Sequence, residues 1–378
     1  MKKKLLISVI FVLFSTILMV EISYAYNNSF SQNPQKSYYN IKPTLYYDIL
    51  DFNIINAEIY MAPHDITKIK YNLETSNNYE EEISFSSKNP NIATVDQNGN
   101  IKSLSNGETE ISMKVKDEVR TAKVLVTNLI EKNNPNPNKT AVGCQTYTEE
   151  DNDILDKILK SRVVEAGLGT RAGVIAAARF LTLEFPYRIT YFSENGRLTS
   201  FNNTSYVDGE GRYYHEGLYL HKSRYKNIKK SSTGPAPWGC SIYSIPAKAL
   251  RNNGLDCSGF ISWVFYNGGL DPGDIGAGIT VNFDFTDLGT KVLLKSAVEN
   301  NTLKVGDLLS GASRNGGHIA ILIGINNGRY YVAESLWGGI AYGAVAMTYT
   351  KEGLTRNFYW QVTMDDYYQK EGNLTNFW

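Results

Sequence analysis

The sequence predicts a multidomain protein in which a small all-β sandwich precedes a larger α+β domain. Three observations support this fold class. Residues 57–130 hold short alternating apolar and polar runs separated by turn residues. Residues 149–185 carry apolar residues at a helical period, and residues 303–364 return to apolar runs typical of strands.

The first 25 residues have the features of a secretory signal peptide. Three lysines, Lys2 to Lys4, precede an uncharged apolar core, Leu5 to Val20, and Ser23 and Ala25 offer a small-x-small cleavage site. A membrane anchor is the alternative, because the 16-residue core lies just below the ~20 residues that span a bilayer. No second apolar run follows, so we expect cleavage, a secreted or wall-associated protein without a membrane anchor, and two domains in the remaining 353 residues.

The charge balance argues against a polyanionic partner. The chain has 38 basic and 38 acidic residues, and loss of residues 1–25 removes three lysines and one glutamate, leaving 35 and 37. The sequence has no cluster of basic residues of the kind that would predict nucleic-acid binding. No HExxH, no CxxC pair and no phosphate-binding glycine loop is present, so we expect neither a metal nor an organic cofactor.

Residues 26–56 are rich in Asn, Ser and Tyr and have no sustained period, so they stay unassigned. Residues 57–130 are typical of a small antiparallel sandwich. Five segments fit strands with one buried face, and the turn signals DQNGN and SNGE separate some of them; the segments are 82–87, 91–96, 100–105, 109–116 and 120–128.

Within this region, Ser84 to Val115 resembles the group 2 bacterial immunoglobulin-like domain. The tryptophan usual near the start of that pattern is replaced by Phe85, which keeps an aromatic residue for the core. The resemblance implies a spacer or adhesive unit on a bacterial surface. The residues that match the pattern of this family are Asn89, Pro90, Ala93, Val95, Asp96, Gly99 and Gly107. His64, the histidine of this region, has no cysteine or cluster of acidic residues near it in the sequence, so no catalytic group is predicted here.

A polar, proline-punctuated linker is predicted at residues 131–140. Residues 141–378 then form the second predicted domain. It opens with one helix that ends at Gly167 and a second that begins near Thr170 and ends before Pro186. Residues 186–250 are loop-rich, and an Asn-Asn-Gly turn joins two apolar runs as a hairpin after His318.

The candidate nucleophile is Cys257, at the start of the amphipathic stretch CSGFISWVFYNGG. The N-terminus of a helix favours a thiolate, and its free N–H groups can stabilise an oxyanion. Asp256 occupies the N-cap position, where it can accept from the N–H of Ser258 or Gly259. Three cysteines leave one unpaired if a disulfide forms, but the spacing does not show that Cys144 and Cys240 pair. Three buried, unpaired thiols are the alternative.

A cysteine nucleophile needs a base, and His318 at the first position of a strand is the best candidate. Glu334 lies on the return strand, where it can orient the imidazole, although a surface glutamate is the alternative. His215 and His221 fit surface or substrate-groove positions instead.

Four blocks together resemble the NlpC-type cell-wall peptidases, which are papain-like cysteine hydrolases: LDCSGF, KVGDLL, GGHIAILIG and YYVAES. The resemblance covers roughly residues 240–350. It implies cleavage of peptidoglycan stem peptides, typically between D-isoglutamate and a diamino acid. Cys257 would be the nucleophile, His318 the base and Glu334 the orienting residue, although the family more often has His, Asn or Gln there.

The resemblance also implies a tyrosine upstream of the cysteine near the oxyanion site, for which Tyr243 is the nearest candidate. With Asp256 and Ser258, which flank the cysteine, it makes up the predicted substrate-binding residues. Two other classes of function stay open. A papain-like amidase or amide transferase would use the same three residues, and a wall-binding or adhesion protein would use none of them. The sequence determines neither the exact bond, nor the wall chemotype, nor the oligomeric state.

Overall fold

The computed structural model of the chain describes residues 48–76, 82–133, 135–192, 216–221, 237–244, 248–272, 275–277, 284–311, 317–338 and 342–374. The predicted signal peptide and most of the unassigned segment lie outside these residues. No helix in the described ranges is both long and apolar enough to cross a membrane.

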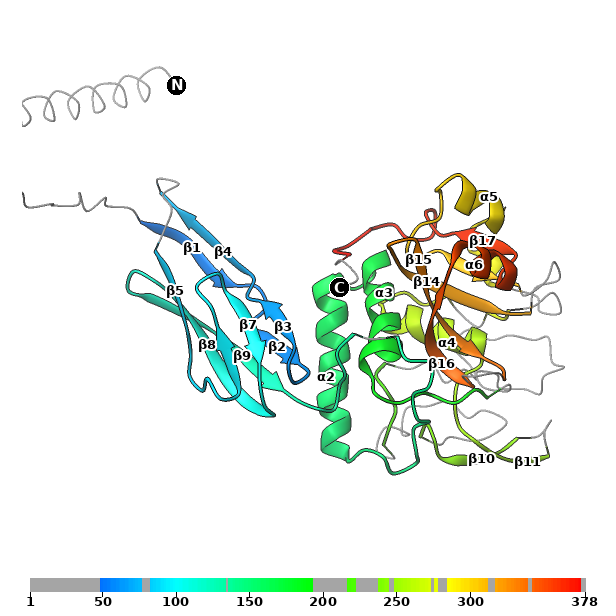
Figure 1. The fold of residues 1–378 in the computed structure, drawn as a ribbon, viewed down its shortest axis with the longest axis horizontal. Coiled ribbons are helices and arrows are strands. Elements are labelled where there is room, and N and C mark those ends of the chain that lie inside the picture. Colours follow the sequence, from blue (N-terminus) through cyan, green and yellow to red (C-terminus); the bar gives the residue numbers. More distant parts are fainter. Residues whose placement is uncertain are drawn as a thin grey trace, which may run out of the picture. The chain divides into compact units, whose positions relative to one another are not determined.

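The first region is all β, as predicted, and builds its core between three small sheets (Figure 1). Their strand orders are β2–β9–β8–β5, β3–β7–β6 and β1–β4. Strand β2 runs parallel to β9, so the prediction of a wholly antiparallel sandwich is wrong at this pair. The strands are β1 (Ile49–Ile54), β2 (Glu58–Met61), β3 (Ile66–Lys68), β4 (Tyr71–Thr75), β5 (Ile83–Ser87), β6 (Ala93–Val95), β7 (Asn100–Ser103), β8 (Gly107–Val115) and β9 (Glu118–Val126).

In these strands the apolar residues that alternate in the sequence are the buried ones, and the polar residues between them face outward or are partly exposed. Along β8, Ile111, Met113 and Val115 are fully buried, and the residues between them are not. Phe85, at the position of the expected tryptophan, packs in the same core. Phe52 of β1 belongs to this core as well, so the sandwich begins upstream of residue 57.

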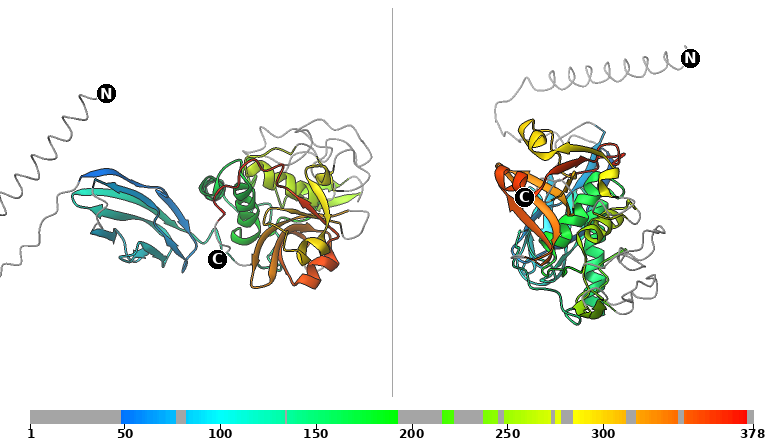
Figure 2. Two further views of the ribbon diagram at one scale, coloured as in Figure 1. Left: turned by 90° about the horizontal axis from the view of Figure 1, so that it is seen from above. Right: turned by 90° about the vertical axis from the view of Figure 1, so that its right-hand side faces the viewer.

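The second region is α+β, with one six-stranded sheet of order β12–β17–β13–β14–β15–β16, all of its pairs antiparallel. Helices cover both faces of this sheet (Figure 2). The strands are β12 (Thr290–Leu293), β13 (Leu308–Ser310), β14 (Ile319–Asn326), β15 (Arg329–Leu336), β16 (Gly343–Tyr349) and β17 (Trp360–Thr363), and a separate hairpin joins β10 (Ser241–Ser244) to β11 (Ala249–Asn252). The helices are α2 (Glu149–Ala166), α3 (Arg171–Arg179), α4 (Cys257–Asn267), α5 (Leu294–Glu299) and α6 (Lys351–Asn357), with a π-helix at Phe180–Glu184 and a 3₁₀ turn at Phe285–Asp287.

Strand β14 is a continuous apolar run because both of its faces are buried. Ile319, Ile321 and Ile323 pack in the core with α3 and α4, whereas Ala320 and Leu322 pack in the core with α5 and α6. Burial on both faces removes the polar alternation of a half-exposed strand. The predicted hairpin is confirmed, since β14 pairs with β15 across the turn at Asn327 and Gly328.

The two predicted helices are confirmed: the first ends at Gly167 as predicted, and the second begins after Thr170 and continues into a π-helix, Phe180–Glu184, that ends before Pro186. Thr148 caps α2 through a capping box with Asp151, and Gly167 ends the helix with a φ of 113°. Thr170 caps α3 by accepting from the N–H of Gly173. The segment predicted as a polar linker contains one buried charge: the Nζ of Lys139 donates to the Phe185 carbonyl at 2.6 Å.

A disulfide joins Cys144 to Cys240, with the two Cα atoms 4.1 Å apart. The sequence left this pairing open. The bond closes a loop across a sequence separation of 96 residues, most of which connects α3 to α4. It leaves Cys257 as the free cysteine of the chain.

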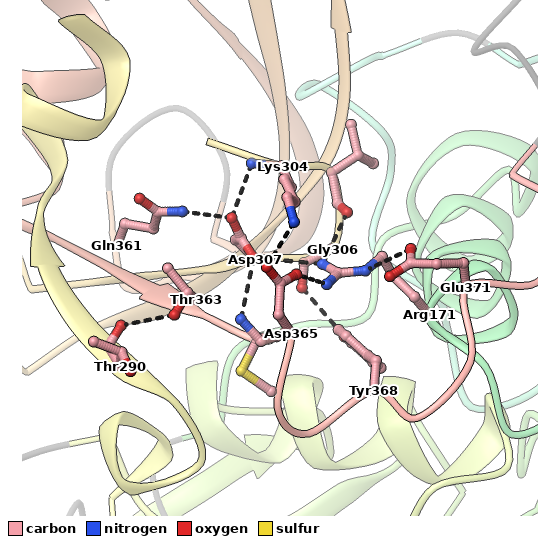
Figure 3. A network of polar contacts seen from close by, with 12 residues as sticks. Arg171, Thr290, Lys304, Gly306, Asp307, Gln361, Thr363, Asp365, Tyr368 and Glu371 are labelled. Atoms are coloured by element: carbon pink, nitrogen blue, oxygen red, sulfur yellow. Dashed lines mark hydrogen bonds and ion pairs between the residues drawn. The ribbon is translucent and has the colours of Figure 1, made fainter. Parts of the chain in front are cut away.

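Arg171 centres a polar network that fixes the end of the chain to α3 and to the Gly306–Asp307 turn (Figure 3). Its guanidinium pairs with Asp307 at 3.4 Å, pairs with Asp365, and lies 4.6 Å from the centre of the Tyr368 ring. Asp307 also accepts from the side chain of Gln361 and from the backbone N–H groups of Lys304 and Met364. The Asp307 of the KVGDLL block is therefore a buried structural carboxylate.

Replacing Arg171 by Met is expected to lower the free energy of unfolding by about 3–5 kcal/mol, because it leaves the buried Asp307 without its cation. Lys304→Ala is the matched control. It breaks the half-exposed Lys304–Asp365 pair and should cost less than about 1 kcal/mol. Urea denaturation followed by circular dichroism measures both, and equal losses would contradict a special role for the buried pair.

Candidate active site

Cys257 is the first residue of α4, as the sequence predicted. Asp256 caps the helix: its carboxylate accepts from the N–H of Gly259 at 2.6 Å and from the hydroxyl of Ser258 at 3.0 Å. The Cys257 side chain is buried and lies at the N-terminus of α4, the positive end of the helix dipole. The helix therefore presents its positive end where a negative charge on sulfur forms.

A close backbone approach fixes the segment that precedes this helix. The N–H of Leu255 donates to the Thr190 carbonyl at 2.9 Å, and a Cβ on Gly254 would lie 1.7 Å from that same oxygen. On its other side, the Ile189 carbonyl accepts from the N–H of Ala344 at the start of β16. Residues 189–190 are thus held between the strand β16 and the loop that leads to Cys257.

His318 and Glu334 come together across the β14–β15 hairpin. The Nε2 of His318 lies 2.7 Å from the Oε2 of Glu334, and the hydroxyl of Tyr349 donates to Oε1 at 2.6 Å. Glu334 is only 1% exposed, so the alternative of a surface glutamate is wrong. A buried carboxylate needs partners for both oxygens, and this one has them.

The imidazole has a third neighbour that the sequence did not indicate. The ring of Phe358, which follows α6, stacks on His318 with 5.9 Å between the ring centres and 23° between the planes. Phe358 also meets the Tyr349 ring edge-on. His318 is therefore oriented by a carboxylate in its own plane and by an aromatic ring against its face.

Electrostatics favours a charged imidazole in this site. Burial alone would lower the pKa of His318, but hydrogen bonds to Cys257 and Glu334 and the negative charge of both raise it to about 10. At neutral pH the imidazole is thus protonated. A protonated imidazole that hydrogen-bonds the Cys257 side chain stabilises negative charge on its sulfur.

Tyr191 is a site residue that the sequence did not reveal. Its hydroxyl forms hydrogen bonds with both the side chain and the backbone of Cys257. Burial, followed by the charges of Cys257 and Asp256, raises the pKa of Tyr191 far above its ordinary value, so the phenol keeps its proton. Tyr191 lies 66 residues before Cys257 in the sequence, so spacing gave no signal.

The remaining predicted residues have different outcomes. Asp256 and Ser258 bind one another, and their role in substrate binding stays a prediction. Tyr243 lies on β10 opposite Leu250, but its side chain is outside what the structure describes, as is His215. The Nδ1 of His221 lies 3.8 Å from the Oε1 of Glu149. Within the described ranges, no group of three or more His, Cys, Asp or Glu residues could hold a metal ion.

The family-model comparison concerns the first region of the fold. Residues 64–126 match the family model of the bacterial Ig-like domain (group 2), which confirms that part of the predicted resemblance. No curated protein matches the chain.

Two solved structures illustrate the matches. Domains 4 and 5 of the S-layer protein SbsC are 16% identical over a match that covers 22% of this chain and 54% of that one, with a TM-score of 0.20. A mutant of intimin from EHEC O157:H7 is 16% identical, with 31% and 68% covered and a TM-score of 0.19. The chain spans about half the length of the first of these structures.

Replacing Glu334 by Gln is expected to lower the pKa of His318 from about 10, because burial then acts without the carboxylate charge that opposes it. A raised folded pKa contributes stability that is fully present below the ordinary value of 6.5 and is lost as pH rises toward 10. NMR titration of the His318 ring measures the pKa. The stability difference between wild type and Glu334→Gln should shrink between about pH 7 and 10, and a difference that grows with pH would contradict this assignment.

Gly254→Ala is expected to displace residues 189–190, because its Cβ cannot share space with the Thr190 oxygen. We expect a loss of stability of roughly 1–3 kcal/mol together with slower alkylation of the Cys257 thiol. Gly353→Ala, inside α6, is the control: its Cβ would come no closer than 3.3 Å to a neighbouring atom. Unfolding curves and iodoacetamide labelling test both variants, and normal labelling of Gly254→Ala would show that the close approach does not position Cys257.

Proposed function

We propose that this protein is a secreted cysteine peptidase that hydrolyses peptide bonds in the stem peptides of peptidoglycan. The observation that carries the proposal is the chain of contacts from Cys257 to His318 to Glu334. It joins a thiol at a helix N-terminus to a base, and the base to a buried carboxylate 2.7 Å away. These are the three roles that thiol catalysis needs.

The substrate class rests on the resemblance of four sequence blocks to the NlpC-type peptidases. A helix that begins at the cysteine and packs against an antiparallel sheet that carries the histidine is also the arrangement expected of a papain-like domain. An immunoglobulin-like region of the bacterial group 2 type precedes it. Such a module would act as a spacer between the peptidase and the cell surface.

The mechanism follows from the residues in contact. The Cys257 thiolate attacks the carbonyl carbon of the stem peptide, and the oxyanion forms beside the N–H groups of the first turn of α4 and the hydroxyl of Tyr191. The His318 imidazolium gives its proton to the departing amine. The neutral imidazole then takes a proton from water, which hydrolyses the thioester and releases the enzyme. Glu334 holds the ring throughout and stabilises its charged form.

Digestion of purified peptidoglycan by the protein, with fragments identified by mass spectrometry, tests this proposal. We expect new stem-peptide ends from the wild type. Cys257→Ala should release none, since no nucleophile remains, and Glu334→Ala, which removes the orienting group, should slow release by roughly 10²–10⁴-fold.

The matched control is Lys304→Ala, a surface change outside the site, which should keep the wild-type rate. New sugar ends, or fragments that persist in Cys257→Ala, would reject the thiol mechanism. Addition of a free amine distinguishes hydrolysis from amide transfer, because a transferase would join the amine to the released acyl group. A wild type that is inert on every wall chemotype would leave binding or adhesion as the function.

A further inference from the structure

Three aromatic side chains form a packed cluster beside the nucleophile: Tyr191, Trp337 and Tyr342. The centre of the Tyr191 ring lies 5.1 Å from that of Trp337 and 5.8 Å from that of Tyr342. The centres of Trp337 and Tyr342 are 5.5 Å apart. All three pairs are in edge or tilted contact, which is the favoured geometry for aromatic rings. The cluster is therefore an ordered arrangement.

Trp337 differs from an ordinary core residue because 66% of its surface is exposed. A buried indole makes one of the larger hydrophobic contributions of any side chain to folding stability. Because Trp337 is mostly exposed, it makes only a small part of that contribution. The two tyrosines hold its orientation and leave the remaining surface open. An exposed aromatic side chain in a fixed orientation is suited to contact with a ligand.

The cluster is continuous with the catalytic residues. Tyr191 hydrogen-bonds Cys257, so one member touches the nucleophile itself. Trp337 comes directly after β15, three residues beyond Glu334, and Tyr342 directly precedes β16. The same two strands thus position the orienting carboxylate and the exposed ring. Trp337 is thus in direct ring contact with the residue that hydrogen-bonds Cys257.

The spacing of the rings indicates what chemistry they suit. Centre-to-centre distances of 5.1–5.8 Å mean direct contact, so no gap between the rings is wide enough to enclose an ammonium group as an aromatic cage does. What remains is an open aromatic surface with an electron-rich face. Such a face suits the polarised C–H groups on the apolar side of a pyranose ring.

We propose that Tyr191, Trp337 and Tyr342 form a saccharide platform on which an N-acetylhexosamine ring of the glycan strand stacks while the attached stem peptide enters the site. This inference rests on the proposed function, because the glycan is part of the same substrate. It assigns Trp337 as the residue that makes the protein select peptides still attached to sugar.

Binding without turnover tests the platform. In the Cys257→Ala background, calorimetry measures the affinity for two probes, the β-1,4-linked tetrasaccharide of N-acetylglucosamine and the tripeptide L-alanyl-D-isoglutamyl-L-lysine. We expect Trp337→Ala to weaken tetrasaccharide binding about tenfold, the loss of one stacking contact. Trp337→Phe should retain most of the affinity, because it keeps an aromatic face.

Leu168→Ala is the control for removal of an exposed apolar side chain, since Leu168 is 62% exposed in the connection between α2 and α3. It should bind as the parent does. Three results would overturn the platform: no binding of the tetrasaccharide by the parent, equal affinity in Trp337→Ala, or a loss confined to the tripeptide. None of these binding measurements depends on hydrolysis. If the wild type proves inactive, the proposed peptidase function is rejected, but the binding measurements still decide whether the platform binds saccharide.

Discussion

The candidate site depends on the contact between the backbone at Thr190 and the loop before α4. Gly254 permits that contact because any Cβ there would collide with the Thr190 oxygen. The Thr190 carbonyl then accepts a hydrogen bond from the N–H of Leu255, and the adjacent Ile189 carbonyl accepts one from the N–H of Ala344. Three segments distant in the sequence are joined at this point. The nucleophile, the hydroxyl of Tyr191 and the first residues of β16 take their relative positions from it.

A second constraint acts from the hairpin side. Ser335, next to Glu334, donates from its hydroxyl to the Leu255 carbonyl at 2.7 Å, in a fully buried position. The strand that supplies the carboxylate is thereby tied to the loop that supplies the cysteine. Because β14 and β15 also exchange regular backbone bonds, His318 is fixed to Glu334 by the same hairpin. The geometry of the candidate site is thus held by buried hydrogen bonds on regular elements, which is what a precisely arranged site requires.

The buried Arg171–Asp307 network and the candidate site use their buried carboxylates differently. The Arg171–Asp307 pair lies in a network that closes the C-terminal segment over α3, and its carboxylate is satisfied by four donors. The Glu334 carboxylate, equally buried, has a titratable histidine as its main partner. One buried acid therefore fixes the fold, whereas the other holds a group that can exchange a proton. The same residue type serves both needs because its partners differ.

The sequence by itself determined the elements whose signals are local. The caps at Thr170 and Asp256 and the hairpin after His318 were readable, because capping and burial follow from neighbouring residues. The roles of Cys257, His318 and Glu334 were predicted from their order along the chain and from the four blocks that resemble the NlpC-type peptidases. Only the tertiary structure decided that Cys144 bonds to Cys240, that β2 runs parallel to β9, and that Tyr191, Tyr349, Phe358 and Trp337 gather around the site. Those contacts join residues far apart in the chain, and no periodicity or spacing records which distant segments a folded backbone brings together.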